Sequence, residues 1–154
     1  MDHAHWMREA LAEARLAAAD GEIPVGAVVV WRDRVIGRGH NRREALHDPT
    51  AHAEILALRE AGRERGGWRL SGATLYCTLE PCPMCAGALV NARIDTLVIG
   101  VRDPKTGAAG SVYDLVRSPW LNHRLRVIAG VLADEVQALM QTFFEDLRPT
   151  DREA

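Results

Sequence analysis

The sequence predicts an α/β fold, a three-layer α/β/α sandwich on a mixed five-stranded sheet. Three observations support this prediction: apolar residues recur at helical spacing near both ends, short apolar runs of strand length lie between them, and turn residues separate the runs. Helices interspersed with buried strands pack on both faces of a sheet. The 154 residues are 47% hydrophobic and contain no linker-like segment, so residues 1–154 are expected to form one domain with a short tail after about residue 148.

The N-terminal part of the chain is expected to form a helix followed by a β-hairpin. Apolar residues spaced by three and four indicate the helix: Met7, Leu11, Ala14 and Ala18. Gly21 and Pro24 end it, because glycine readily adopts a left-handed conformation and proline cannot continue a helix. The apolar run 25–31 is typical of a buried strand, and Asp33 begins the turn into a second strand at 35–41.

The middle of the chain is expected to alternate helices with strands. Thr50 follows a proline and can cap a helix that runs to about Arg63. The segment 74–79 alternates strictly between two sets of side chains, which is typical of a strand. Pro83 suits the first turn of a helix reaching Ala92, because a first-turn N–H has no partner within the helix.

Two strands and a closing helix complete the expected fold. The apolar segments 96–101 and 125–128 are predicted to be the strands. The closing helix ends at Pro149. Its apolar stripe consists of Leu132, Val136, Leu139, Phe143 and Leu147.

The composition excludes several classes of protein. A net charge of −2 gives no global basic surface, so any surface for a nucleic acid must be local. Charged residues interrupt the apolar residues of 1–19, which argues against a signal peptide, and no stretch approaches the roughly 20 apolar residues of a membrane span. Three cysteines, two of them three residues apart, fit a reducing cytoplasm better than a disulfide framework.

One histidine and two cysteines form a candidate metal site. Cys82 and Cys85 are three residues apart and are expected in the first turn of a helix, as is His52 in its own helix. The helix dipole there favours the thiolates that metal binding requires, and this donor set suits Zn²⁺. Three ligands leave a coordination position for water, and Glu54 stands close enough in sequence to move the proton of that water.

A structural zinc site is the alternative to this open site. It would need a fourth ligand, for which Cys77 and His47 are the candidates. The side chain of Cys77 points to the same face of its strand as its apolar neighbours Leu75 and Leu79, so Cys77 is expected to be a core thiol. His47 is expected in a loop. In this alternative Glu54 is a solvated surface charge, because residues two apart do not share a helix face.

Several motifs resemble the bacterial tRNA-specific adenosine deaminases, a family of zinc deaminases in the cytidine and deoxycytidylate deaminase superfamily. The His-x-Glu and Pro-Cys-x-x-Cys pair is the signature of these enzymes. The resemblance also covers PVGAV at 24–28, HDPTAHAE at 47–54, TLEPC at 78–82, DPKTGAAGS at 103–111 and Asn122-His123. It implies a cytidine-deaminase-like fold, one Zn²⁺ per chain, and a homodimer that converts the wobble adenosine of a tRNA anticodon stem-loop, expected in tRNA-Arg, into inosine.

The resemblance also implies roles for individual residues. Glu54 takes a proton from the attacking water, whose oxygen adds to C6 of adenine. Glu54 also passes protons to N1 and to the departing ammonia. Asn41 corresponds to a pocket asparagine that hydrogen-bonds the purine, although by itself it reads as a turn residue. The remaining implied substrate contacts are Val25 and Leu79 as pocket walls, and Asp103, Lys105, Thr106, Asn122 and Arg148 as RNA contacts.

Two rival functions share the metal motif. A zinc deaminase of free bases or nucleosides would use the same ligands, but the segment 103–111 and Asn122 favour the tRNA enzymes. A zinc-binding module without activity is disfavoured by Glu54 and by the lack of an obvious fourth ligand. Trp120, next to Asn122, is a further candidate for stacking on a base.

Overall fold

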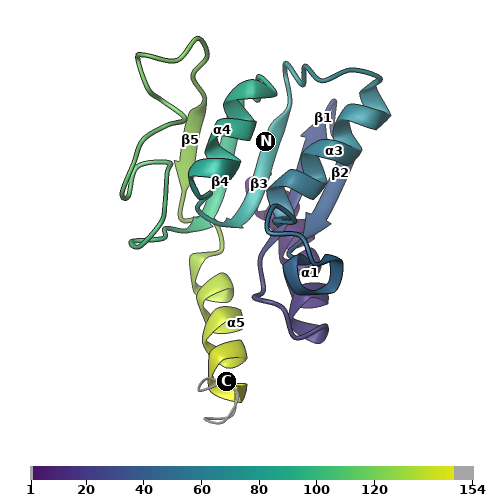
Figure 1. The fold of residues 1–154 in the computed structure, drawn as a ribbon, viewed down its shortest axis with the longest axis vertical. Coiled ribbons are helices and arrows are strands. Elements are labelled where there is room, and N and C mark those ends of the chain that lie inside the picture. Colours follow the sequence, from purple (N-terminus) through teal and green to yellow (C-terminus); the bar gives the residue numbers. More distant parts are fainter. Residues whose placement is uncertain (1, 148–154) are drawn as a thin grey trace.

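The structure, a computed structural model, describes residues 2–147 (Figure 1). One mixed five-stranded sheet in the order β2-β1-β3-β4-β5 carries helices on both faces, which confirms the predicted fold. The elements in chain order are α1 (His3–Ala19), β1 (Gly26–Trp31), β2 (Arg34–His40), α2 (Arg43–Leu46), α3 (Ala53–Arg65), β3 (Thr74–Leu79), α4 (Pro83–Asn91), β4 (Thr96–Val101), β5 (Arg126–Ala129) and α5 (Ala133–Asp146).

The direction of the strands determines where a site can form. β1 pairs antiparallel with β2, as expected for a hairpin, and also with β3. β3, β4 and β5 are parallel, so their carboxyl ends share one edge of the sheet. In folds of this kind ligands bind beyond that edge.

Two apolar cores lie on opposite faces of the sheet. α3 and α4 cover one face, where Val29, Leu75 and Ile99 are buried. α1 covers the other face, where Met7 and Tyr76 are buried. The central strands are buried on both faces, so β1 and β4 are mostly apolar, and even Thr74 and Thr78 of β3 are buried.

Glycines let two helices lie directly on the strands of the hairpin. A Cβ on Gly26 would lie 2.0 Å from the Ala10 carbonyl oxygen of α1. A Cβ on Gly39 would lie 2.5 Å from the Ala53 carbonyl oxygen, in the first turn of α3. The close contact at Gly39 fixes the start of α3 against the end of β2.

Some element boundaries differ from the predictions. Thr50 does not cap α3: its hydroxyl donates to the Asp48 side chain, and His52 is the N-cap residue. The short helix α2 was not predicted, because four residues are too few to show helical periodicity. β5 begins at Arg126, one residue later than expected.

The closing helix packs less fully than its apolar stripe predicts. Val136 is its buried residue, whereas Leu139 and Phe143 are half-buried. Figure 1 gives the reason: α5 extends past the end of the sheet, so its second half leaves the strands behind. Within residues 2–147, no helix combines the length and the apolar content that a membrane span requires.

Candidate metal centre and active site

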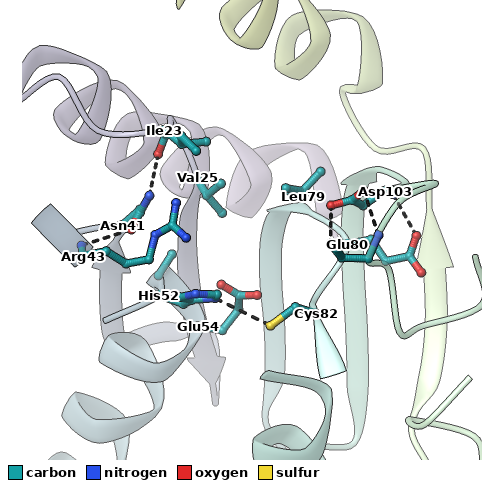
Figure 2. A pocket seen from close by; sticks show the side chains of 12 residues that line it. Ile23, Val25, Asn41, Arg43, His52, Glu54, Leu79, Glu80, Cys82 and Asp103 are labelled. Atoms are coloured by element: carbon teal, nitrogen blue, oxygen red, sulfur yellow. Dashed lines mark hydrogen bonds between the residues drawn. The ribbon is translucent and has the colours of Figure 1, made fainter. Parts of the chain in front are cut away.

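Two helix N-termini bring the predicted metal ligands together. His52 is the N-cap residue of α3 and Cys82 is the N-cap residue of α4, while Cys85 lies in the first turn of α4. His52 and Cys82 thus stand one position before the first turns in which they were expected. Both have extended backbone conformations and make no side-chain capping bond. Their side chains therefore turn away from their own helices and toward each other (Figure 2).

The distances between the three donor atoms fit a tetrahedral zinc ion. His52 Nδ1 lies 3.6 Å from Cys82 Sγ and 3.5 Å from Cys85 Sγ. Zn–S bonds of about 2.3 Å and Zn–N bonds of about 2.0–2.1 Å at tetrahedral angles separate sulfur from nitrogen by about 3.6 Å. All three donor atoms lie within 4.8 Å of one another. The donor set and its spacing are those of a zinc centre.

The two thiols of this centre share a proton unequally. A hydrogen bond from Cys85 lowers the pKa of Cys82 to about 4, and the same bond raises the pKa of Cys85. One sulfur is therefore already a thiolate at neutral pH, as a metal ligand must be. A divalent cation would take the place of the shared proton and hold both sulfurs as thiolates.

No fourth protein ligand joins the centre within the described part of the chain. Cys77 is fully buried in the core under α3 and α4, and burial raises the pKa of its thiol. His47 is exposed at the end of α2, where its φ of 50° follows the last helical turn. The position of these two residues supports the open, three-ligand centre over the structural zinc site.

Glu54 lies in the same site, although it is two residues from His52. His52 is an N-cap residue with extended backbone, so the angular spacing of a regular helix does not apply to this pair. Glu54 is 3% exposed, and its Oε1 atom is buried without a hydrogen-bond partner. Burial raises the pKa of its carboxyl group. A buried carboxylate oxygen without a partner is costly, which points to a ligand or water that it serves.

A cavity of about 220 Å³ opens above these residues. Val25 and Leu79 form apolar walls, and His52, Glu54 and Cys82 line its inner part (Figure 2). Its volume is below the roughly 300–1,000 Å³ of sites for drug-sized ligands, so it suits one heterocyclic base rather than a whole nucleotide.

Asn41 lines this cavity and also shapes the adjoining turn. Its side-chain nitrogen donates to the Ile23 carbonyl at 3.3 Å, and its Oδ1 accepts from the Arg43 N–H at 3.2 Å. Each of these groups retains one further donor or acceptor position. Asn41 therefore fits both interpretations that the sequence left open, a turn residue and a pocket residue.

Glu80 organises one rim of the cavity and was not recognised from the sequence. Its carboxylate is fully buried and accepts the Asp103 N–H at 3.0 Å, the Ala109 N–H at 2.9 Å and the Ser111 N–H at 3.0 Å. The Ser111 hydroxyl donates to it as well. These hydrogen bonds lower the pKa of Glu80 against the opposing effect of burial. The sequence signal that could have identified Glu80 is its position, directly after the buried strand β3 and two residues before the metal ligand Cys82.

A second buried carboxylate holds the opposite rim. Glu22 is 4% exposed and accepts the backbone N–H groups of Glu44 at 3.0 Å and Ala45 at 3.1 Å, at the start of α2. It thereby ties the turn before β1 to the segment that carries Arg43. No local sequence signal indicates this contact, because its partners are more than 20 residues away.

The predicted RNA contacts do not all lie at the cavity. Asp103 and Thr106 line it, and the Thr106 hydroxyl donates to Asp103 at 2.8 Å. Lys105 lies between them on the exposed rim. Asn122 lies at the other edge of the sheet, since the adjacent His123 contacts the Ile94 carbonyl just before β4.

Two further candidates lie apart from the cavity as well. Trp120 is 92% exposed in the loop that carries Asn122. Arg148 lies outside the described residues.

Comparison with known proteins gives a consistent result. A family model described as MafB19-like deaminase matches residues 1–148. The tRNA-specific adenosine deaminase of Bacillus subtilis (strain 168) is 46% identical over 149 residues, which cover 97% of this chain and 92% of the relative. The protein of that name from Haemophilus influenzae is 50% identical over 143 residues, which cover 92% of this chain and 83% of the relative.

Solved structures agree with the sequence relatives. One from a study of A-to-I editing by tRNA:A34 deaminases at the wobble position matches with a TM-score of 0.85 and 46% identity, over 88% of this chain and 98% of its own. A guanine deaminase from Nitrosomonas europaea matches with a TM-score of 0.75 and 29% identity, over 91% and 83%. The chain therefore belongs to the MafB19-like deaminases, in the branch of the tRNA-specific adenosine deaminases.

Proposed function

We propose that the protein is a zinc-dependent tRNA adenosine deaminase that converts adenosine 34, at the wobble position of a tRNA, into inosine. One observation carries the chemistry: a buried Glu54 oxygen without a partner faces a base-sized cavity beside three metal-ligand atoms. The choice of tRNA as the substrate rests on the similarity to these relatives. We extend the proposal to the anticodon stem-loop of tRNA-Arg, as the sequence resemblance implies.

In this proposal His52, Cys82 and Cys85 hold one Zn²⁺. Bound zinc supplies Lewis acidity, which makes water easier to deprotonate at neutral pH. Glu54 accepts the proton of the attacking water, and the oxygen of that water adds to C6 of adenine. Glu54 delivers this proton to N1, then takes the second proton from the hydroxyl group now on C6 and passes it to the amino group, which leaves as ammonia when its bond to C6 breaks. Its raised pKa suits this exchange, because a general base works best when its pKa lies near the working pH.

The cavity walls orient the base in this proposal. Val25 and Leu79 contact the two faces of the purine, which excludes water from the reacting carbon. Asn41 uses its free N–H and its remaining lone pair on the ring edge of the purine. Because two backbone contacts already fix its amide, little conformational freedom is lost on binding.

The rim 103–111 contacts the nucleotides around the flipped adenosine. Asp103 and Thr106 line the cavity mouth, and the adjacent Lys105 offers an exposed ammonium group to the phosphate backbone. We retain Asn122 and Arg148 as RNA contacts on the basis of the resemblance. Because Asn122 lies at the far edge of the sheet, it would contact a part of the RNA distant from the base in this cavity.

The function is tested with purified, zinc-loaded protein. An anticodon stem-loop with adenosine at the wobble position should yield inosine, detected by nuclease digestion and chromatography, whereas free adenosine, guanine and cytidine should not react. Turnover of free guanine but not of the stem-loop would replace the proposal with a base deaminase. No turnover of any substrate with zinc bound would leave a binding module.

We further propose that the protein forms a homodimer through an apolar groove between α3 and α4. The groove has a volume of about 710 Å³, and Ile55, Leu58 and Trp68 line it. Trp68 is 59% exposed and adjoins these apolar side chains, and a contiguous apolar surface of this kind marks an interaction site. Both helices begin at the metal centre, whereas the groove lies toward their C-terminal ends, where Gly62, Asn91 and Ala92 line it.

Sedimentation analysis tests the dimer. Trp68→Glu should give monomers, because burying a charge in the groove is unfavourable. The control is Trp120→Glu, which changes a more exposed tryptophan outside the groove and should leave the dimer intact. A monomeric wild-type protein would refute the dimer. We also propose that residues 1–154 act as one domain and that the protein works in the cytoplasm, where the thiols of Cys82 and Cys85 stay reduced.

A further inference from the structure

Arg43 lies at the mouth of the cavity and has no assigned role. It is the one arginine or lysine among the residues that line the cavity in the described chain. Its side chain is exposed, and Figure 2 shows its guanidinium group turned toward the cavity, next to Asn41 and above His52. A cation in this place faces whatever is covalently attached to a base bound inside.

The Arg43 guanidinium is free, whereas three other arginines form close ion pairs. Arg34, Arg38 and Arg117 each form an ion pair with a carboxylate at 2.9–3.2 Å. Across residues 2–147, neither an ion pair nor a hydrogen bond occupies the Arg43 guanidinium. Its five N–H donors therefore remain available to a ligand.

The backbone that carries Arg43 is held from two sides. The Arg43 N–H donates to Asn41 Oδ1, so the arginine is tied to the residue expected to read the purine edge. The next two N–H groups, of Glu44 and Ala45, donate to the buried Glu22 carboxylate. A long side chain on a fixed backbone loses less conformational freedom when it binds than one on a mobile loop.

We propose that Arg43 binds a phosphodiester group adjacent to the nucleotide whose base enters the cavity, and that Glu22 is the positioning residue for this contact. The planar guanidinium matches two phosphate oxygens, and no carboxylate competes for it. The ligand class is a polynucleotide, because a free base has no phosphate to present. Lys105, on the opposite rim, gives the backbone a second cation on the far side of the base. This inference rests on the proposed function and deepens it.

The test combines a protein variant with a neutral backbone. Stem-loop substrates carry a methylphosphonate in place of the phosphodiester on the 5′ or the 3′ side of the wobble adenosine, which removes one charge and leaves the base unchanged. The variants are Arg43→Ala and Arg43→Lys. Arg42→Ala is the matched control, an exposed arginine one residue away that does not line the cavity.

With wild-type protein, one of the two methylphosphonates should raise KM about tenfold with little change in kcat. Arg43→Ala should raise KM to the same extent on the natural substrate, be insensitive to that methylphosphonate, and lower the salt dependence of binding by about one charge. Arg43→Lys should restore part of the affinity, because it keeps the charge but not the planar donors. Arg42→Ala should behave as wild type, and all variants should keep their zinc content and melting temperature.

The outcomes separate this inference from the proposed function. If wild-type protein fails to deaminate the stem-loop, the proposed function is overturned and the inference with it. If wild-type protein is active and Arg43→Ala binds normally, or remains sensitive to both methylphosphonates, only the inference is overturned. To test the positioning role, Glu22→Gln should raise KM for the natural substrate and weaken the response to the same methylphosphonate. A Glu22→Gln variant with wild-type KM would overturn that role.

Discussion

Replacing Glu80 with glutamine perturbs the link between the metal centre and the substrate rim. Glu80 is two residues from Cys82, and its two oxygens accept three backbone N–H groups and one hydroxyl from the segment 103–111. Glutamine has nearly the same shape but one acceptor oxygen. If that oxygen keeps the Ala109 and Ser111 N–H groups, the new NH₂ group faces the Asp103 N–H. The Ser111 hydroxyl can rotate and accept a hydrogen bond from this NH₂ group, but the Asp103 N–H can only donate and is left without an acceptor.

The expected cost follows from this count of donors. One buried N–H left without an acceptor costs about 1–3 kcal/mol, and two bonds that lose their charged acceptor weaken by roughly 0.5–1 kcal/mol each. The sum is about 3 kcal/mol. For a chain of this length each kcal/mol shifts the melting temperature by about 2–4 °C, so Glu80→Gln should melt about 6–12 °C below wild type.

Calorimetry and hydrogen exchange together check this reasoning. The zinc-loaded variant should show the lower melting temperature, faster exchange confined to the segment 103–111, and a higher KM for the stem-loop with normal zinc content. Ser111→Ala is the matched control: it removes the hydroxyl but leaves every backbone donor with its acceptor, so it should lose only about 1 kcal/mol. Equal melting temperatures for the two variants, or unchanged exchange at Asp103, would refute the account.

Four further substitutions have defined outcomes. Glu54→Ala should bind about one zinc per chain, measured by atomic absorption, and lose turnover, because it removes the proton shuttle but no ligand. Cys77→Ala should retain zinc and most activity, because the thiol lies in the core outside the ligand set. Gly39→Ala should be destabilised by about 1–3 kcal/mol in denaturant titrations, because its Cβ would lie 2.5 Å from a backbone oxygen of α3. Burial raises the pKa of Tyr76 to about 12, so the free energy of unfolding should fall as pH rises from about 10 to about 12 in wild type, and less in Tyr76→Phe.

The metal centre was predictable because its information is local. Cys82 and Cys85 are three residues apart, and Pro83 between them marks the start of α4. His52 and Glu54 likewise stand at the start of one helix. The sheet order could be inferred only as far as a mixed sheet, because the antiparallel pairing of β1 with β3 joins residues 44–50 apart, which no single turn connects.

The substrate rims were less predictable because long-range contacts fix them. The bonds from Glu80 to the segment 103–111 span 23–31 residues, and those from Glu22 to α2 span 22 and 23 residues. No periodicity or turn preference records such contacts. The far placement of Asn122 has the same origin: the loop before β5 leaves the carboxyl edge of β4 and must reach the opposite edge, because the two strands are parallel.

Both rims rely on a buried carboxylate, and this has a consequence for specificity. Burying Glu22 and Glu80 incurs a desolvation cost that hydrogen bonds from the rims offset, helped at Glu80 by the Arg102 guanidinium at 4.0 Å, so each rim holds its position only while its donors match the carboxylate. The metal centre depends on neither set of bonds, since its ligands stand on helix N-termini supported by the cores. A change in a rim can therefore alter which substrate reaches the metal without disturbing the metal itself. Such independence explains how one fold serves different substrates: a guanine deaminase shares this fold at 29% identity.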